Sequence, residues 1–177
     1  MVRDNMESRQ QEQLKAMRNR MPDVENVKVA VRVRPFSQRE SQRNARNIIS
    51  MYQKTTFLNN PDVPNEEPKK FTFDYSYWSH DGYREKEKGL IVRDPNHPNG
   101  DKYCDQLTVY NDLGKGVLHN AWEGYNSTLF AYGQTSSGKS WSIVGYGVNK
   151  GIVPMFCEDL FKNIADSKAA GERIEFE

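Results

Sequence analysis

The sequence predicts an α/β domain with a partly parallel sheet, on the strength of three features. Valines alternate with mostly charged residues along 27–33, which is the period-two pattern of a strand. Apolar residues recur at a spacing of four along 107–122, which predicts a helix. A short apolar run at 127–132 follows this helix and precedes a second helical stretch, as a buried strand would. Strands and helices in this order are typical of α/β domains.

The N-terminal part of the chain divides into an arm and the start of a domain. Residues 1–22 contain many helix formers but almost no apolar periodicity, so a solvated helix or a disordered arm is expected. A partner-binding helix is the alternative, disfavoured by the missing apolar stripe. The domain is predicted to cover 23–177. Its first strand is stopped by Pro35, and the polar stretch 37–47 is predicted to be a loop.

The next elements are short strands and loops. A hairpin is predicted at 48–58 and a proline-rich loop at 59–68. Residues 71–75 alternate again and predict a strand. The charged segment 79–105, rich in glycine and proline, is predicted to be a long insertion loop that is either functional or incidental, with a short strand near 90–92.

Helices dominate the C-terminal part. The helix at 107–122 is predicted to close at Gly124, and helical stretches should follow residues 133–140 and span 152–164. A last alternating stretch at 173–177 predicts the start of another strand, at which we expect the domain to be truncated. Packing roles are predicted for the larger apolar side chains around the strand at 127–132 and for two tryptophans: Leu129, Phe130, Tyr132, Trp78 and Trp122.

The composition indicates a soluble chain of one domain. Among the 177 residues, 36% are hydrophobic and 28% charged, and the net charge is +1, so neither nucleic acid nor an acidic membrane is indicated as a partner. The mean hydropathy of −0.88 indicates long exposed loops or a flexible end. No apolar run approaches the ~20 residues that cross a bilayer, and the polar N-terminus is unlike a signal peptide. We therefore expect a cytosolic protein without membrane insertion.

The cysteines and histidines are too scattered to predict a metal centre. Cys104 and Cys157 lie far apart without a CxxC spacing, whereas a zinc site needs a cluster of cysteine or histidine. Two reduced thiols are the preferred interpretation. No catalytic role is assigned to the three histidines, His80, His97 and His119.

Residues 133–140 carry the chemistry. They read Gly-Gln-Thr-Ser-Ser-Gly-Lys-Ser and match GxxxxGK[ST] at every fixed position. In this P-loop the glycines let successive backbone N–H groups cradle phosphates, and the following helix presents its positive end. Lys139 is expected to reach the β- and γ-phosphates, and the Ser140 hydroxyl to coordinate Mg²⁺. A glycine-rich surface turn is the weaker alternative.

A second magnesium anchor is not evident from the pattern. Such an anchor is usually an aspartate after an apolar strand. Asp74 precedes the P-loop and has only two flanking apolar residues, and Asp159 sits inside a helical run. We expect Asp74 to be a structural residue at a strand end.

The sequence around the P-loop resembles a known family. Residues 124–140 read GYNSTLFAYGQTSSGKS and resemble the kinesin signature GYNxxxFAYGQTxSGK[ST] at every fixed position. Arg-Val-Arg-Pro at 32–35 is similar to the RxRP that ends the first kinesin strand, and Phe-Thr-Phe-Asp at 71–74 is similar to the kinesin FxFD strand. Residues 109–114 look like the start of the helix before the P-loop strand. The resemblance spans about 27–165 in collinear order, and residues 75–80 resemble the kinesin-three vesicle-transport branch, although 81–105 is longer than in that branch.

The resemblance implies a P-loop NTPase fold of the kinesin motor type, with a central mixed β-sheet flanked by helices and truncated after the P-loop helix. It implies ATP or ADP with Mg²⁺ as ligands and a catalytic role for Lys139. One wall of the adenine site should be the RxRP segment, and Trp141 should be the other. The alternatives are that Arg32 and Arg34 are solvated charges and that Trp141 is an aromatic residue of the core. The expected nucleotide contacts are Arg32, Arg34, Pro35, Gln134, Thr135, Ser136, Ser137, Gly138, Lys139, Ser140 and Trp141.

The resemblance also implies a function for the whole protein. Kinesins couple ATP hydrolysis to movement along microtubules, so microtubules (tubulin), a cytoplasmic and cytoskeletal location and a coiled coil elsewhere are expected. The two kinesin switch motifs, NxxSSR and DxxGSE, do not occur in these 177 residues, so we expect the fragment alone to be catalytically incomplete. The alternative is a degenerate kinesin that binds nucleotide or a partner without turnover. An unrelated P-loop kinase or GTPase is weaker, because no guanine-reading NKxD motif is present.

Overall fold

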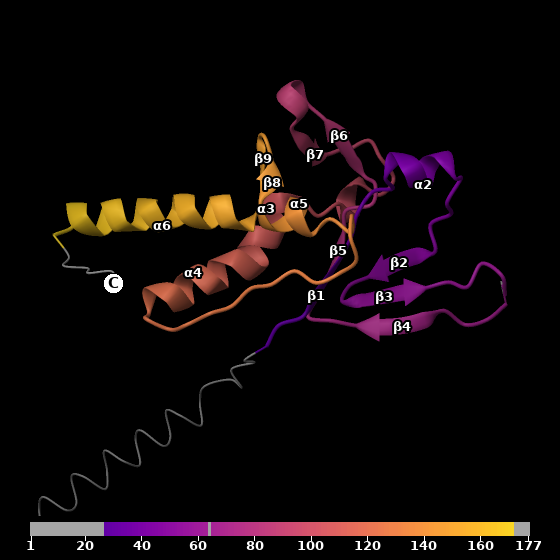
Figure 1. The fold of residues 1–177 in the computed structure, drawn as a ribbon, viewed down its shortest axis with the longest axis horizontal. Coiled ribbons are helices and arrows are strands. Elements are labelled where there is room, and N and C mark those ends of the chain that lie inside the picture. The colour runs from indigo at the N-terminus through magenta and orange to yellow at the C-terminus, as the bar shows by residue number, and fades with distance from the viewer. Residues whose placement is uncertain (1–26, 64, 172–177) are drawn as a thin grey trace, which may run out of the picture.

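The computed structural model describes residues 27–63 and 65–171, and Figure 1 shows their arrangement. The predicted arm at 1–22 and the predicted strand at 173–177 lie outside the described residues. Two helices, α4 (Lys115–Trp122) and α6 (Ile152–Ala169), lie at one end of the molecule, and a three-stranded sheet lies at the other. Between them runs a parallel pair of strands, β1 (Ala30–Val33) and β5 (Tyr75–Trp78).

The first strand is shorter than predicted. The alternating pattern begins at Val27, but β1 begins at Ala30, and Val27 is 74% exposed. The strand is held at its start by Asp74, whose carboxylate accepts a hydrogen bond from the Val29 N–H at 2.7 Å. The Asp74 N–H in turn donates to the Val29 carbonyl at 3.0 Å. Asp74 is therefore a structural residue beside the strand.

The predicted hairpin at 48–58 is confirmed. Strands β2 (Ile49–Tyr52), β3 (Thr55–Leu58) and β4 (Lys69–Thr72) form an antiparallel sheet in that order. The single strand predicted at 71–75 is wrong, because β4 ends at Thr72 and β5 begins at Tyr75 in another sheet. The backbone changes partners at this point: the Phe73 N–H bonds to the carbonyl of Lys54, whereas the next N–H bonds to Val29.

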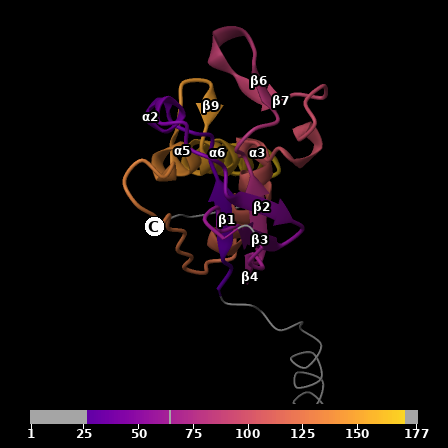
Figure 2. The ribbon, with the colours of Figure 1, turned by 90° about the vertical axis from the view of Figure 1, so that its right-hand side faces the viewer.

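Two predicted loops contain regular structure. Residues 37–47 include a short helix, α2 (Gln38–Gln42), whose capping box joins Ser37 and Glu40. The Ser-x-x-Glu spacing was a readable signal for this helix. The insertion 79–105 forms a hairpin of β6 (Tyr83–Glu85) and β7 (Ile91–Arg93), with 3₁₀ turns at Glu87–Gly89 and Gly100–Lys102. Figure 2 shows that this hairpin stands away from the sheets that contain β1–β5.

The helical predictions are confirmed with altered bounds. Residues 106–122 form one continuous helical run: α3 (Gln106–Val109), a π-helical turn (Tyr110–Gly114) and α4. Gly124, at φ +79°, ends it, and the Tyr125 N–H closes the turn on the Asn120 carbonyl at 2.8 Å. After the P-loop come α5 (Lys139–Ile143), a small hairpin of β8 (Gly145–Tyr146) and β9 (Asn149–Lys150), and α6.

The buried core lies where β5 meets the helices. Its most buried members are Tyr77, Val109, Tyr110 and Ile152. Both tyrosine hydroxyls donate to carboxylates, from Tyr77 to Asp112 at 3.1 Å and from Tyr110 to Asp159 at 2.6 Å. Burial raises the pKa of both phenols, which keeps them neutral donors. Trp78 is buried and Trp122 is half-buried, in keeping with the packing roles predicted for them.

The buried strand predicted at 127–132 does not form. No strand of the described residues pairs with this segment, which runs as extended chain from Gly124 to the P-loop. Phe130 is 81% exposed and Tyr132 is 95% exposed, so the core roles predicted for them are wrong in this structure. Leu129 alone of the three packs against the core. A strand needs a neighbour for its N–H and C=O groups, and none lies beside this segment in the part of the chain described.

Candidate functional site

The P-loop backbone adopts a conformation that requires its glycines. Gly133 has φ +147° and Gly138 has φ +98°, and between them Ser136 also has a positive φ, +65°. The φ of Gly133 is one that residues with a side chain rarely adopt, and a Cβ atom there would lie 2.6 Å from the Ser137 hydroxyl oxygen and 3.2 Å from the Ser137 Cβ. The Ser137 N–H donates to the Gln134 carbonyl at 3.2 Å and closes the turn.

Lys139 lies over this loop. Its Nζ donates to the carbonyls of Gly133 and Gln134, both at 2.8 Å, so the ammonium sits above the loop that it follows in sequence. Ser140, the second residue of α5, is exposed, and its hydroxyl is open to a ligand. A cation and a hydroxyl held beside a tight glycine turn are the groups that bind a phosphate and its metal ion.

Arg34 joins the end of β1 to the P-loop. Its Nε donates to the Ser136 carbonyl at 2.8 Å, and its two terminal nitrogens lie 2.7 and 2.9 Å from the carboxylate oxygens of Glu40. The same guanidinium donates to the Pro35 carbonyl at 2.6 Å. The hydrogen bond with Arg34 lowers the pKa of Glu40 to about 2, and the pKa of Arg34 is raised by the same contact. Arg34 is therefore a fixed positive charge beside the loop.

A cavity of about 250 Å³ adjoins the P-loop. Gln134 and Ser137 line it on the loop side, and Arg34, Phe36 and His80 line it on the β1 side. The rings of Phe36 and His80 meet edge to face with centroids 4.7 Å apart, and His80 Nδ1 lies 3.0 Å from the Arg34 carbonyl oxygen. The sequence prediction missed Phe36 and His80. Two signals could have indicated them: Phe36 directly follows the Arg-x-Arg-Pro segment, and His80 lies two residues after the aromatic strand β5.

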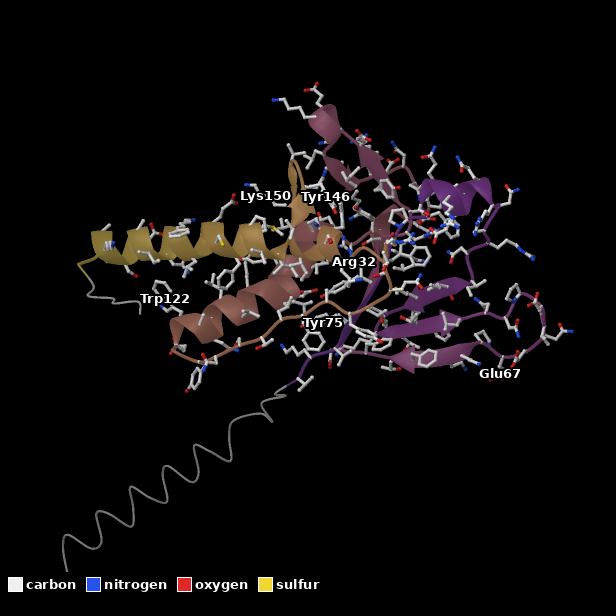
Figure 3. The ribbon with its side chains drawn as sticks, viewed as in Figure 1. Arg32, Glu67, Tyr75, Trp122, Tyr146 and Lys150 are labelled. Atoms are coloured by element: carbon white, nitrogen blue, oxygen red, sulfur yellow. The ribbon has the colours of Figure 1, made fainter. Side chains whose placement is uncertain are left out.

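Arg32 lies at the junction of β1, the insertion and α5, near the centre of Figure 3. Its Nε donates to the Ser79 hydroxyl at 2.9 Å, and Nη1 donates to Gln106 Oε1 at 2.6 Å and to the Ser142 hydroxyl at 3.1 Å. Nη2 reaches the Cys104 carbonyl at 3.3 Å. Burial lowers the pKa of Arg32, whereas the surrounding polar groups satisfy its donors. Arg32 also borders the cavity, although its nitrogens face this network.

Trp141 and Pro35 do not line the cavity. The Trp141 ring stacks on that of Tyr146, with centroids 6.0 Å apart and planes 29° apart. Its carbonyl accepts a hydrogen bond from Gln106 Nε2 at 2.6 Å. Of the predicted nucleotide contacts, the structure brings four together around this cavity: Arg32, Arg34, Gln134 and Ser137. The other predicted contacts do not line it: Pro35, Thr135, Ser136, Gly138, Lys139, Ser140 and Trp141.

The aspartates considered as metal anchors both have structural partners. Asp74 accepts from the Val29 N–H, and Asp159 accepts from the Tyr110 hydroxyl. Among residues 27–63 and 65–171, no group of three or more histidine, cysteine or acidic side chains could hold a metal ion. Cys104 and Cys157 are free thiols. None of the helices in these ranges combines the length and the apolar character that crossing a membrane requires.

Comparison with known proteins places the chain in a family. The model of the kinesin motor domain matches residues 32–177. The chain is 48% identical to Kinesin-like protein KIF28 of Rattus norvegicus over 86% of its own length, which is 14% of that protein. It is 49% identical to Kinesin-related protein 1 of Dictyostelium discoideum, with 78% of the chain and 6% of the relative covered.

Solved structures agree with the sequence relatives. KIF14 with ADP in complex with a microtubule matches with a TM-score of 0.64 and 42% identity, covering 79% of this chain and 34% of that one. The KIF14 dimer with AMP-PNP in complex with a microtubule gives a TM-score of 0.66 and 41% identity. The chain therefore spans only a part of the relatives that it matches. On the family match and the identity together, this chain belongs to the kinesin motor domain family.

Proposed function

We propose that this chain forms the ATP-binding part of a microtubule-based motor ATPase. The observation that carries the proposal is the P-loop with Lys139 bound over it, in a chain that belongs to the kinesin family. Relatives of the same fold were solved with ADP or AMP-PNP in complex with a microtubule. Because the chain spans 14% of its KIF28 relative, the activity belongs to the whole protein.

The P-loop residues are suited to ATP or ADP with Mg²⁺. Gly133 and Gly138 permit the tight turn that a side chain would obstruct or strain, and Lys139 brings a positive charge to the carbonyls of Gly133 and Gln134. The N–H groups of 134–140 would bind the phosphates, Lys139 would neutralise the β- and γ-phosphates, and the exposed Ser140 hydroxyl would ligate Mg²⁺. The metal supplies charge neutralisation of the phosphates when it is bound.

The cavity beside the P-loop is suited to the base of the nucleotide. Arg34 is fixed at its edge by Ser136 and Glu40, and Phe36 and His80 add flat aromatic surface on which a base can stack. Arg32 and Pro35 belong to the same segment of the chain. Trp141, which stacks on Tyr146 outside the cavity, would contact the base only from another side.

Turnover and movement are proposed for the complete protein. By the family relation, its site would hydrolyse ATP, stimulated by microtubules, and the protein would act in the cytoplasm on the microtubule cytoskeleton. No nucleic-acid or membrane partner is part of the proposal. The switch motifs required for hydrolysis do not occur in residues 1–177, so this part of the protein alone would bind nucleotide but turn it over poorly.

The decisive experiment measures phosphate release by the full-length protein with ATP or GTP, with and without microtubules. We expect hydrolysis of ATP in preference to GTP, and a large increase on addition of microtubules. Binding of ATP without turnover in either condition would support the degenerate, non-motor alternative. Preference for GTP would contradict the assignment of the base site.

A further inference from the structure

The insertion 79–105 is clamped to the hairpin that follows the P-loop helix. The side chain of Asn149, in β9, is buried. Its Nδ2 donates to the Gly89 carbonyl at 2.8 Å, and its Oδ1 accepts from the Ile91 N–H at 2.9 Å. One amide thus binds two backbone groups of the insertion hairpin, across 58 and 60 residues of sequence. An amide whose donor and acceptor are both used in this way fixes position and orientation together.

The clamp leads directly to the P-loop helix α5. Asn149 lies opposite Tyr146 in the β8–β9 pair, and the Tyr146 ring stacks on Trp141, one residue after Ser140. Figure 3 labels Tyr146 on this hairpin, beside the insertion. The two strands and the residues that flank them approach each other closely. A Cβ at Gly145 would lie 2.0 Å from the Asn149 carbonyl oxygen, and a Cβ at Gly151 would lie 2.5 Å from the Ile143 carbonyl oxygen. Asn149 and Tyr146 are joined by strand pairing, so a shift of one backbone is passed to the other, while the Tyr146 ring, 63% exposed, is held by its contact with Trp141.

The base of the insertion is tied to the same helix. Ser79 and Cys104, at the two ends of the insertion, are joined by the Ser79 hydroxyl, which donates to the Cys104 carbonyl at 2.6 Å. Arg32 donates to both of them and to Ser142 on α5. Gln106 adds a bond from its amide to the Trp141 carbonyl. The insertion is thus joined to α5 through Arg32 at its base and through Asn149 at its hairpin.

From these contacts we propose that the insertion 79–105 positions the P-loop helix, with Asn149 as the positioning residue that transmits the effect. The inference rests on the proposed function, because the position of α5 matters through Lys139 and Ser140. The insertion hairpin projects from the molecule, and within the described residues its side-chain hydrogen bonds to the segment after the P-loop helix are those with Asn149. Its influence on the nucleotide passes from Asn149 through Tyr146 and Trp141 to the first turn of α5.

The test substitutes Asn149→Ala in the full-length protein, with Val148→Ala as the matched control. Val148 lies next to Asn149 in the same hairpin but is exposed. The measurements are the affinity for MgADP and the ¹⁹F spectrum of 5-fluorotryptophan, with the Trp141 signal assigned from Trp141→Phe. We expect Asn149→Ala to weaken MgADP about 3- to 30-fold and to shift the Trp141 signal. The signals of Trp78 and Trp122 should stay in place, and Val148→Ala should change neither quantity.

A second variant reaches the clamp from its other side, in case Asn149→Ala does not fold. Ile91→Pro removes the N–H that donates to Asn149 Oδ1, and the extended backbone of Leu90 before it (φ −70°, ψ 118°) is compatible with a following proline. This variant should shift the Trp141 signal in the same direction as Asn149→Ala and should lower the affinity for MgADP by a similar factor. An unmoved Trp141 signal with unchanged affinity in either folded variant overturns the positioning role. If the wild-type protein binds no nucleotide, the proposed function fails, whereas a Trp141 shift in the variants would still uphold the mechanical link.

Discussion

Two segments of this chain have the residues of a strand, and only one of them is a strand. The segment 30–33 forms β1, pairs with β5 and sends Arg32 into a network of four partners. The segment 127–132 has an equally apolar sequence but pairs with no strand of the described residues, and Tyr132 is 95% exposed. Both segments end at the site: Arg34 follows the first, and the P-loop follows the second.

We infer from this difference that stability depends mainly on the paired region and that ligand binding depends mainly on the unpaired one. The paired region holds the site in place through buried side chains and satisfied polar groups. The unpaired region contributes a loop whose conformation is fixed locally, by Gly133, Gly138 and the Lys139 contacts. Substitutions in the first region should therefore affect folding, whereas those in the second should affect ligand binding.

The sharpest separation is expected from Lys139→Ala in the full-length protein. Loss of the ammonium removes a charge from the β- and γ-phosphates, so ATP turnover should fall about 10³-fold or more. The melting temperature should stay unchanged, because the lysine bonds only to the loop itself. Lys115→Ala, an exposed lysine in α4, is the control for steady-state turnover and thermal unfolding. Turnover at the wild-type rate in Lys139→Ala would remove the P-loop from the mechanism.

A pair of tyrosines compares the two regions directly. Tyr77 is 4% exposed and Tyr132 is 95% exposed. We expect Tyr77→Ala to lower the free energy of unfolding of the 177-residue chain by about 3–5 kcal/mol, as for other buried aromatics. Tyr132→Ala should change it by less than about 0.5 kcal/mol. Urea unfolding measures both, and a large loss for Tyr132→Ala would mean that 127–132 is packed in solution.

Arg32→Met tests whether the Arg32 side chain stabilises the hydrogen-bond network around β1 or contacts the nucleotide. The substitution leaves Ser79, Gln106 and Ser142 without their shared donor, so the free energy of unfolding should fall by about 2–4 kcal/mol. Arg39→Met, on an exposed arginine of α2, is the matched control. Unchanged stability with weaker ATP binding would show instead that Arg32 acts as a ligand contact.

Trp141→Ala separates base stacking from packing. A contact with the base predicts that affinity for ATP weakens by about 1–3 kcal/mol. If Trp141 acts only through its contact with Tyr146, Tyr146→Ala should weaken ATP binding as much as Trp141→Ala does. If Trp141 also stacks on the base, Trp141→Ala should weaken binding more than Tyr146→Ala. Titration calorimetry of the two variants distinguishes these outcomes, and Trp141→Phe should retain most of either contact.

The smallest expected effect is a titration. Glu40 has its pKa lowered from 4.5 to about 2, first by the hydrogen bond from Arg34. Because the folded pKa is the lower one, the stabilising contribution is present above about pH 4.5 and is lost as pH falls toward 2. NMR detection of the Glu40 carboxyl should give a midpoint near 2, and Arg34→Met should move it upward toward 4.5. A midpoint unaffected by that substitution would contradict the ion pair.

Much of the fold was predictable because its signals are local. The hairpin at 48–58, the helices at 107–122 and 152–164, and the turn at Gly124 follow from periodicity and glycine within a few residues. Helix α2 also had a local signal, in Ser37 and Glu40, that the loop prediction overlooked. The division of 71–75 between two sheets had no such signal, because it depends on which distant strand each residue meets.

The P-loop could be predicted from eight consecutive residues, 133–140, and the family from these together with 124–132, 32–35 and 71–74. Which side chains surround the P-loop depends instead on tertiary contacts. Arg32 finds its partners 47, 74 and 110 residues away, and Asn149 finds Gly89 across 60. The tertiary structure also decided that 30–33 is a strand and 127–132 is not. Strand propensity is a property of residues, whereas a strand exists only where another backbone satisfies its hydrogen bonds.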